Sequence, residues 1–372
     1  RFHAHHPARI AHRLGGLRGS ARLKSVRFLI PGDPDTRTGG YLYDRRIMAG
    51  LATLGWRVEL HRLDASFPTP TPMALQETTE ILATLPDQTL AVVDGLALGA
   101  MPEAVAPHRD RLRLVGLVHH PLALETGLDK TQQQTLYASE REALRSVCHV
   151  IVTSPSTVRA LADYDVSPKR CTVVPPGTDP APLATGSSNG ELALLCAASL
   201  TPRKGHAVLF RALASLKYLP WRLRCAGSEM LDPATTARLR TLIDELVLRD
   251  RVELLGELDT DELAARYLEA DVFVLPSFHE GYGMVLAEAL ARGLPIVSTT
   301  AGAIPDTVPA AAGLLVPPGD EAALAAALAR VLTDLELRRR LAAGARAARA
   351  TLPDWPATCA RFAATLEVVL AR

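Results

Sequence analysis

The 372-residue chain contains few cysteines, and no two of them stand at the C-x-x-C spacing of a metal or redox motif. Most of the five lie within apolar runs. Cysteines of this kind are typical of reduced core residues in a cytoplasmic protein. We therefore expect a cytoplasmic location, with most of the following side chains in the core: Cys148, Cys171, Cys196, Cys225 and Cys359.

The chain also lacks a long apolar run and a large net charge. No uncharged apolar stretch reaches the roughly 18 residues that suggest a membrane-spanning helix. The formal net charge is +1, so no global field favours a nucleic acid partner. Residues 1–24 contain no acidic residue, no Met and no long apolar core, which excludes a secretory signal. We interpret this basic leader either as disordered chain or as a contact to a partner chain or to anionic lipid at the inner membrane face.

What the sequence does contain is a repeated alternation of short apolar runs with helical segments. Such runs are typical of strands buried on both faces of a parallel sheet. Residues 171–190 are rich in Pro, Gly, Ser and Asn and are predicted to link two blocks. The sequence therefore predicts an α/β protein of two Rossmann-like, doubly wound domains that face each other across a cleft. The predicted strands are residues 25–30, 57–63, 89–95, 111–120 and 149–156 in the first block, and 191–199, 221–227, 251–256, 271–277 and 295–299 in the second.

Two glutamates stand in unexpected surroundings in "HEGYGMVLAEALARG", residues 279–293. Glu280 precedes a Gly-x-Gly, and Glu288 lies inside an otherwise apolar helix, where an unpaired charge is costly. This loop follows a strand, and ligands of open α/β sheets bind at the carboxyl ends of the strands. Gly281 and Gly283 allow a close approach of the backbone, and the helix N-terminus suits a diphosphate. Glu288 would then bind a ribose diol and Glu280 sugar hydroxyls; alternatively, Glu288 pairs with an arginine and Glu280 is a solvated loop residue.

Other charged residues and glycines also follow the carboxyl ends of predicted strands. Arg203 and Lys204 follow the first strand of the second block, where cations could neutralise a leaving diphosphate. Gly39 and Gly40 stand at a helix start after the first strand of the chain, but the complete G-x-G-x-x-G of a dinucleotide site is absent. His119 ends a strand that faces the expected cleft, where it could be functional or structural.

Metal-dependent and nucleophilic chemistry find little support in the sequence. Asp259 and Asp261 form a D-x-D, but they begin a predicted helix, where Asp is an ordinary N-cap residue. Ser154 and Ser156 follow a strand without a surrounding G-x-S-x-G. We therefore predict no metal ligands and no cofactor.

The stretch "PSFHEGYGMVLAEALARGLPIVST" strongly resembles the E-x7-E segment of the family-four retaining glycosyltransferases of GT-B fold. The resemblance continues in order from about residue 25 to the end, through "GDPDTRTGGYLYD", "LVHH", "VTSPST", "VVPPGTDP", "TPRKG", "AGAIPD" and "GLLVPPGD". It implies a first, acceptor-side domain over residues 25–183 and a second, donor domain over residues 190–352. It also implies that the last helix, residues 355–372, packs back on the first domain.

The resemblance implies roles for the residues singled out above. Glu288 would bind the donor ribose, Glu280 and His119 the transferred sugar, and Lys204 the diphosphate, beside Gly39 or Gly40. The family usually has Gly-Arg where this chain has Ala198–Ser199, so Arg203 or another basic residue would have to replace that arginine. The implied catalytic residues are Glu280, His119 and Lys204, and the implied donor-binding residues are Gly39, Gly40, Arg203, Lys204, Gly281, Tyr282, Gly283, Met284, Val285 and Glu288.

The sequence thus predicts a metal-independent, retaining glycosyltransferase that uses a nucleotide-sugar donor. The acceptor, a small molecule, lipid or polysaccharide precursor, would bind the first domain around residues 36–46, 64–75 and 119–135. Two alternatives share the architecture: a sugar-nucleotide epimerase, and a catalytically impaired nucleotide-sugar-binding homologue, which Ser199 would favour.

Overall fold

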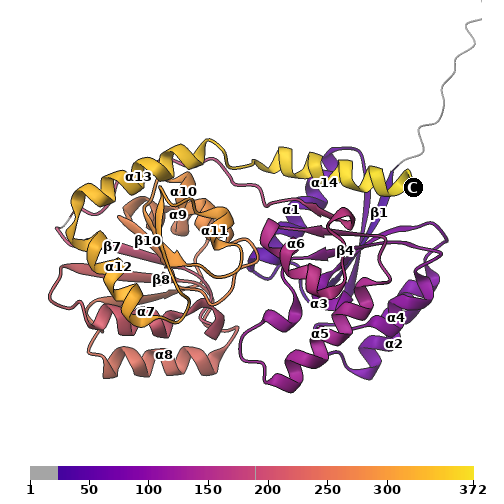
Figure 1. Cartoon of the computed structure of the whole chain (residues 1–372), viewed down its shortest axis with the longest axis horizontal. Helices are drawn as coiled ribbons and strands as arrows, with labels where there is room; N and C mark the ends of the chain where they lie inside the picture. Colours follow the sequence, from indigo (N-terminus) through magenta and orange to yellow (C-terminus); the bar gives the residue numbers. More distant parts are fainter. Residues whose placement is uncertain (1–23, 189) are drawn as a thin grey trace, which may run out of the picture.

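The computed structural model describes residues 24–188 and 190–372. Two parallel α/β domains lie side by side along the long axis of the molecule (Figure 1). The basic leader predicted for residues 1–24 lies outside the described residues, apart from Lys24. Among the helices described, none is long and apolar enough to cross a membrane.

The first domain is built on a sheet of order β2-β1-β3-β4-β5-β6, and every strand pair in it is parallel. Strand order reverses between β1 and β3. The strands are β1 (Ser25–Pro31), β2 (Arg57–Leu63), β3 (Leu90–Asp94), β4 (Arg113–Val118), β5 (His149–Val152) and β6 (Cys171–Val173). The main helices are α1 (Gly39–Thr53), α2 (Pro72–Thr84), α5 (Lys130–Leu144) and α6 (Pro155–Leu161), with the short α3 (Gly95–Leu98) and α4 (Pro102–Val105).

The second domain repeats this plan with the order β12-β11-β10-β7-β8-β9, again parallel throughout. Here the order reverses between β7 and β10. The strands are β7 (Leu192–Ala197), β8 (Trp221–Ala226), β9 (Val252–Gly256), β10 (Val272–Leu275), β11 (Ile296–Thr299) and β12 (Gly313–Val316). The helices are α7 (His206–Ala214), α8 (Pro233–Glu245), α9 (Thr260–Glu269), α10 (Met284–Ala291), α11 (Ile304–Thr307), α12 (Glu321–Thr333) and α13 (Leu335–Arg349).

Helix α14 (Trp355–Leu370) returns from the second domain to the first (Figure 1). Its apolar side chains join the core that covers one face of the first sheet, and Phe362 stacks on Phe28 with 6.1 Å between ring centroids. Arg113 fastens the end of the helix by donating to the carbonyls of Val369 and Leu370. The last helix therefore connects the two domains a second time.

The two doubly wound domains predicted from the sequence are confirmed, with one correction in the predicted linker. The sequence predicts a linker that begins at residue 171. In the structure, residues 171–173 instead form strand β6, which pairs with β5 at the edge of the first sheet. These residues are only half-buried. A short, half-exposed edge strand lacks the apolar run that reveals a central strand.

Candidate functional site

The carboxyl ends of β7 and β10 meet where the strand order of the second sheet reverses, the place where doubly wound sheets bind ligands. A one-turn helix, Pro202–Lys204, follows β7 and carries Arg203 and Lys204. Gly205 ends it with φ +73°, and a Cβ there would lie 2.1 Å from the carbonyl oxygen of Pro276. Only glycine lets this loop press against the residues after β10, so the turn delivers Lys204 to the β10 loop.

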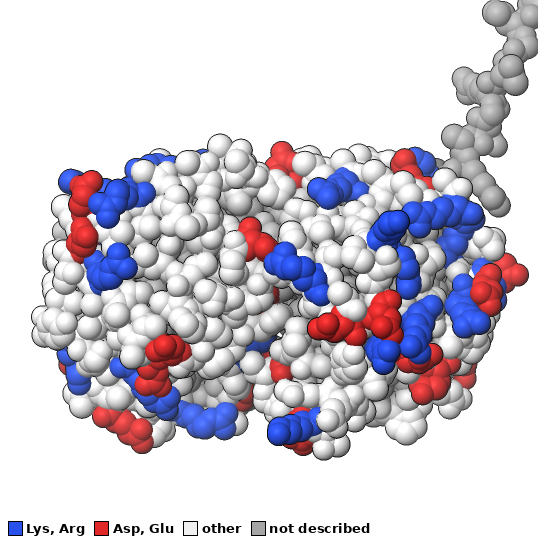
Figure 2. All heavy atoms as spheres, viewed as in Figure 1, with Lys and Arg blue, Asp and Glu red and all other residues white. Residues whose placement is uncertain are grey.

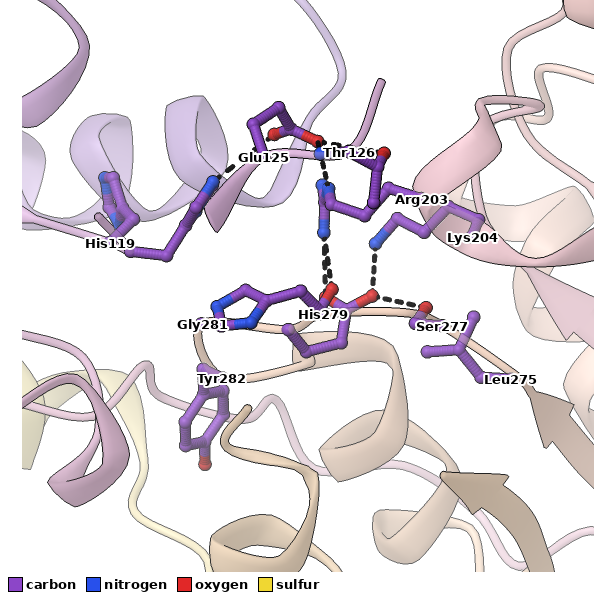
Figure 3. Close-up of polar contacts among 12 residues, drawn as sticks. His119, Glu125, Thr126, Arg203, Lys204, Leu275, Ser277, His279, Gly281 and Tyr282 are labelled. Atoms are coloured by element: carbon purple, nitrogen blue, oxygen red, sulfur yellow. Dashed lines mark hydrogen bonds and ion pairs between the residues drawn. The ribbon is translucent and has the colours of Figure 1, made fainter. Parts of the chain in front are cut away.

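Glu280, in the loop after β10, contacts two cations and a hydroxyl. Figure 3 labels these three partners, Arg203, Lys204 and Ser277. Glu280 Oε1 accepts from Lys204 Nζ at 2.6 Å and from Ser277 Oγ at 2.6 Å, and Arg203 Nη1 lies 3.7 Å from Oε2. Burial raises the pKa of Glu280, but the charges of Lys204 and Arg203 outweigh it, so the pKa lies below its usual value. Burial also lowers the pKa of Lys204, which Glu280 partly restores. Glu280 therefore belongs to a buried cluster of charged side chains and is not a solvated loop residue.

The Glu288 carboxylate is hydrogen-bonded to a tyrosine and is not in an ion pair with an arginine among the described residues. Its carboxylate accepts from the Tyr267 hydroxyl at 3.0 Å. Arg292 stacks on the Tyr267 ring at 4.3 Å and donates to the main-chain carbonyl of Glu288, while no Lys or Arg among the described residues forms an ion pair with its carboxylate. Burial raises the pKa of Glu288 overall, while the hydrogen bond from Tyr267 and the charge of Arg292 lower it in part, and Asp179, on the segment that leaves the first domain, adds to the rise. Arg292 thus lies near Glu288 without forming an ion pair with its carboxylate.

The first domain contributes a carboxylate–imidazole cluster that sequence reasoning found only in part. His119, after β4, lies with its Nε2 3.3 Å from Asp44 of α1 and 3.6 Å from Asp94 at the end of β3. Both carboxylates are buried, and neither Asp44 oxygen has a hydrogen-bond partner among the described residues. Burial and the neighbouring Asp44 raise the pKa of Asp94 to about 7. Burial lowers the pKa of His119, but Asp44 and then Asp94 raise it above its usual value overall.

Asp44 and Asp94 gave weak signals in the sequence. Asp94 ends a predicted strand, as His119 does, and that shared position could have indicated it. Asp44 lies one turn after Gly40, where an acidic residue resembles an ordinary solvated helix position. Gly40 lies against the His119 ring, where a Cβ would make an ordinary contact at 3.5 Å.

Several of the predicted residues of the two domains meet at one interface, whereas Glu288 and Val285 contact Tyr267 within the second domain. A Cβ on Gly281 would lie 2.2 Å from the His119 carbonyl oxygen, and one on Gly39 3.7 Å from Met284 Sδ. The Thr153 hydroxyl lies 3.3 Å from the carbonyl oxygens of both His119 and Gly281. Gly283, with φ +82°, precedes the first residue of α10, so the amino end of this helix opens at the interface.

Arg203 also crosses between the domains. Its Nε lies 3.1 Å from Glu125, which in turn contacts His120 at 3.3 Å. Burial raises the pKa of Glu125, but the hydrogen bond with His120 and the charge of Arg203 lower it to about 2 overall. Arg203 therefore stands beside Lys204 with its charge directed into the interface.

A cavity of about 230 Å³ opens beside these residues. Glu280, His279 and Gly302 line it from the second domain, and Pro121, Leu124, Ser156, Thr157 and Ala160 from the first. The side chain of Tyr282 points away from Lys204 and Arg203 in Figure 3, and its carbonyl accepts from Thr307. The Val285 carbonyl accepts from the Tyr267 hydroxyl at 3.3 Å, and its side chain packs on the core of the second domain. On the outer surface drawn in Figure 2, acidic and basic side chains lie interspersed.

Two family profiles match consecutive parts of the chain. Residues 45–182 match the family described as Glycosyltransferase Family 4, and residues 182–348 match Glycosyl transferases group 1. The boundary between the two matches, residue 182, lies in the extended segment between β6 and β7.

Curated relatives and solved structures agree with these profiles. The chain is 29% identical to the MMP alpha-(1->4)-mannosyltransferase of Mycolicibacterium hassiacum over 83% of this chain and 77% of that protein. It is 33% identical to the D-inositol 3-phosphate glycosyltransferase of Corynebacterium efficiens over 61% of this chain and 60% of that protein, so it matches less than two thirds of the latter. Sucrose-phosphate synthase from Thermosynechococcus elongatus has a similar fold, with a TM-score of 0.80 and 24% identity over 94% of this chain and 99% of that one.

Proposed function

The chain belongs to the family-4 glycosyltransferases of GT-B fold, and we propose that it moves a sugar from a nucleotide-sugar donor to an acceptor hydroxyl with retention at the anomeric carbon and without a catalytic metal ion. The observation that carries this proposal is the convergence of Lys204, Arg203 and the start of α10 on Glu280, opposite His119. Cations and a helix N-terminus suit a leaving diphosphate. The hydrogen-bonding side chains around them suit a sugar.

The chemistry asked of these residues is electrostatic. As the bond from the anomeric carbon to the diphosphate breaks, negative charge grows on the phosphate and positive charge on the sugar ring. Lys204 and Arg203 would stabilise the first, and the carboxylate of Glu280 the second, in a site that excludes water. The acceptor would attack the face from which the diphosphate leaves, so no protein nucleophile is required.

Arg203 is proposed to replace the arginine that the family usually has at position 199. Its guanidinium lies 3.7 Å from Glu280 and donates to the His279 carbonyl, beside Lys204. A diphosphate would compete with Glu125 and Glu280 for the two cations. This supply of positive charge argues against a catalytically impaired protein.

Glu288 and the first-domain cluster complete the proposed assignment. Glu288 would exchange part of its contact with Tyr267 for the ribose diol. His119, whose pKa the neighbouring Asp44 and Asp94 raise, would donate to a hydroxyl of the transferred sugar. The acceptor would enter on the first-domain side, over residues 36–46, 64–75 and 119–135.

A panel of UDP-, GDP- and ADP-sugars, with the matching nucleoside diphosphates, tests the proposal by thermal stabilisation. Ligands that bind only the folded state raise its melting temperature. We expect one base to stabilise the protein clearly more than the others, and product NMR to show the donor's anomeric configuration. An inverted product, or stabilisation by none of the donors, would refute the proposal. Turnover to an isomeric nucleotide-sugar without acceptor would indicate an epimerase.

A further inference from the structure

Three potential metal ligands lie together in the core of the second domain, in a cluster that the proposed transfer reaction does not use. Cys196 belongs to β7, Cys225 to β8, and His206 is the first residue of α7. One ligand atom from each lies within 4.8 Å of the other two, and all three residues are buried. We call these residues the Cys–His–Cys cluster.

The fold itself brings the cluster together. Strands β7 and β8 pair in parallel with Cys196 opposite Cys225, which places both thiols on the same face of the sheet. Helix α7 begins directly after the loop that follows β7, and its first side chain reaches back over the sheet. Cys196 Sγ and His206 Nε2 are 3.6 Å apart. Residues up to 29 positions apart in the sequence thus lie together in the fold.

The spacing fits a metal ion. Zinc binds sulfur at about 2.3 Å and imidazole nitrogen at about 2.0 Å, so a tetrahedral ion holds these two donors about 3.5 Å apart. The two atoms are hydrogen-bonded in this structure, and their separation of 3.6 Å also matches that of two ligands of one ion. Two thiolates and one imidazole match soft or borderline cations and not Mg²⁺ or Ca²⁺, which require oxygen ligands.

The charges also fit. A metal ion displaces the protons of its thiol ligands, so two thiolates would balance the charge of a divalent ion held in the core.

Contrary to the sequence-based prediction of no metal ligands, we propose that the Cys–His–Cys cluster binds a divalent metal ion of the zinc class. Three protein ligands leave the fourth tetrahedral position to a small exogenous ligand. Lys204 and Gly205 directly precede His206, so the ion would fasten the loop that carries Lys204 to strands β7 and β8. This proposal is independent of the transfer reaction proposed above, because no ligand of the cluster touches the cavity.

Metal content tests the site without an activity assay. The full chain is purified in the presence of Zn²⁺, and unbound metal is removed by gel filtration. Elemental mass spectrometry then measures the zinc content per chain. We expect about one equivalent of zinc per chain, and at least about a tenfold loss in Cys196→Ala and in Cys225→Ala. The matched control is Cys359→Ala, which removes a buried thiol of the first domain and should keep the zinc.

Cobalt substitution separates this site from other zinc-binding groups. His3, His5 and His6 near the amino end could also bind zinc, but only thiolate ligands give a sulfur-to-cobalt charge-transfer band. We expect this band in the wild-type protein and in Cys359→Ala, so the test holds even if the cluster variants do not fold. Absence of retained zinc, absence of the band, or equal loss in Cys359→Ala would each overturn the proposal.

Discussion

At the scale of single residues, Lys204 is the group whose loss separates diphosphate binding from nucleoside binding. Lys204→Ala removes a sheltered charge-assisted contact, so nucleoside diphosphate affinity should fall by about 2–4 kcal/mol, whereas free nucleoside affinity changes little. Calorimetric titration of both ligands measures this. Lys217→Ala, an exposed lysine of the same domain, is the control. An equal loss of affinity for nucleoside and nucleoside diphosphate would show that Lys204 does not act on the diphosphate.

Substitutions of Glu288 and of Glu280 should affect different properties, the first ligand binding and the second turnover. Glu288→Gln keeps the shape but weakens the hydrogen bonds to a diol, so every ligand that contains the nucleoside should bind more weakly, by about 1–3 kcal/mol. Glu280→Gln should nearly preserve nucleoside diphosphate affinity and lower kcat, since its charge faces the part of the donor that becomes positive. Binding titrations and steady-state kinetics on both variants distinguish them. If the two variants show the same pattern, the separate assignments are wrong.

The cluster around His119 makes stability depend on pH. Asp44 and Asp94 raise the pKa of His119 above its unfolded value of about 6.5. The stabilisation from its protonation is therefore complete below about pH 6.5 and is lost as pH rises through the raised folded pKa. Asp44→Asn should lower the His119 pKa more than Asp94→Asn does, because Asp44 is the nearer carboxylate.

Two measurements check this order. NMR titration of the imidazole should give the highest pKa in the wild type and the lowest in Asp44→Asn. The melting temperature of the wild type relative to Asp44→Asn should fall as pH rises from 6 to about 9. An unchanged His119 pKa in both variants would show that the carboxylates do not hold the proton.

At the scale of elements, helix α9 explains the D-x-D of the sequence. Asp259 is its N-cap, as the sequence predicted, and accepts from Glu262 N at 2.8 Å; the two residues form a capping box. Asp259→Ala should therefore cost about 1 kcal/mol of stability and leave kcat intact.

Turnover should also persist in EDTA. A reversible loss of activity in EDTA that Mn²⁺ or Mg²⁺ restores would contradict this; Zn²⁺ buried in the Cys–His–Cys cluster would not exchange in this way.

Elements also show where sequence patterns carry information. Central strands such as β3, β5 and β10 are buried throughout, so each appears as an apolar run that the sequence displays directly. Strand β6 is half-buried at a sheet edge and was assigned to the linker. The glycines and charges at strand ends were found because ligand-binding loops follow a local pattern. The contacts of Asp44 with His119 and of Arg203 with Glu125 join residues 75 and 78 positions apart, which no local pattern reveals.

At the scale of the whole molecule, the site exists only where the two domains meet. The loop before α10 rests against the His119 carbonyl, Ser156 donates to Asp306 and to the Gly302 carbonyl, and Arg203 pairs with Glu125. Each contact joins the first domain to the second. Donor and acceptor groups can therefore be aligned only when the interface is formed, so catalysis should depend on the closeness of the domains as well as on the residues in the cavity.

Gly281→Ala tests that dependence. Its new Cβ would lie 2.2 Å from the His119 carbonyl oxygen in the other domain, so the domains must separate although each can keep its own fold. The radius of gyration in solution should increase, and kcat/KM should fall by about 10²-fold, as expected for a misplacement of about 1 Å. Lys217→Ala, which changes an exposed side chain of the second domain outside the site, is the control. If Gly281→Ala keeps the wild-type dimensions and turnover, the tight approach of the domains is not required for the reaction.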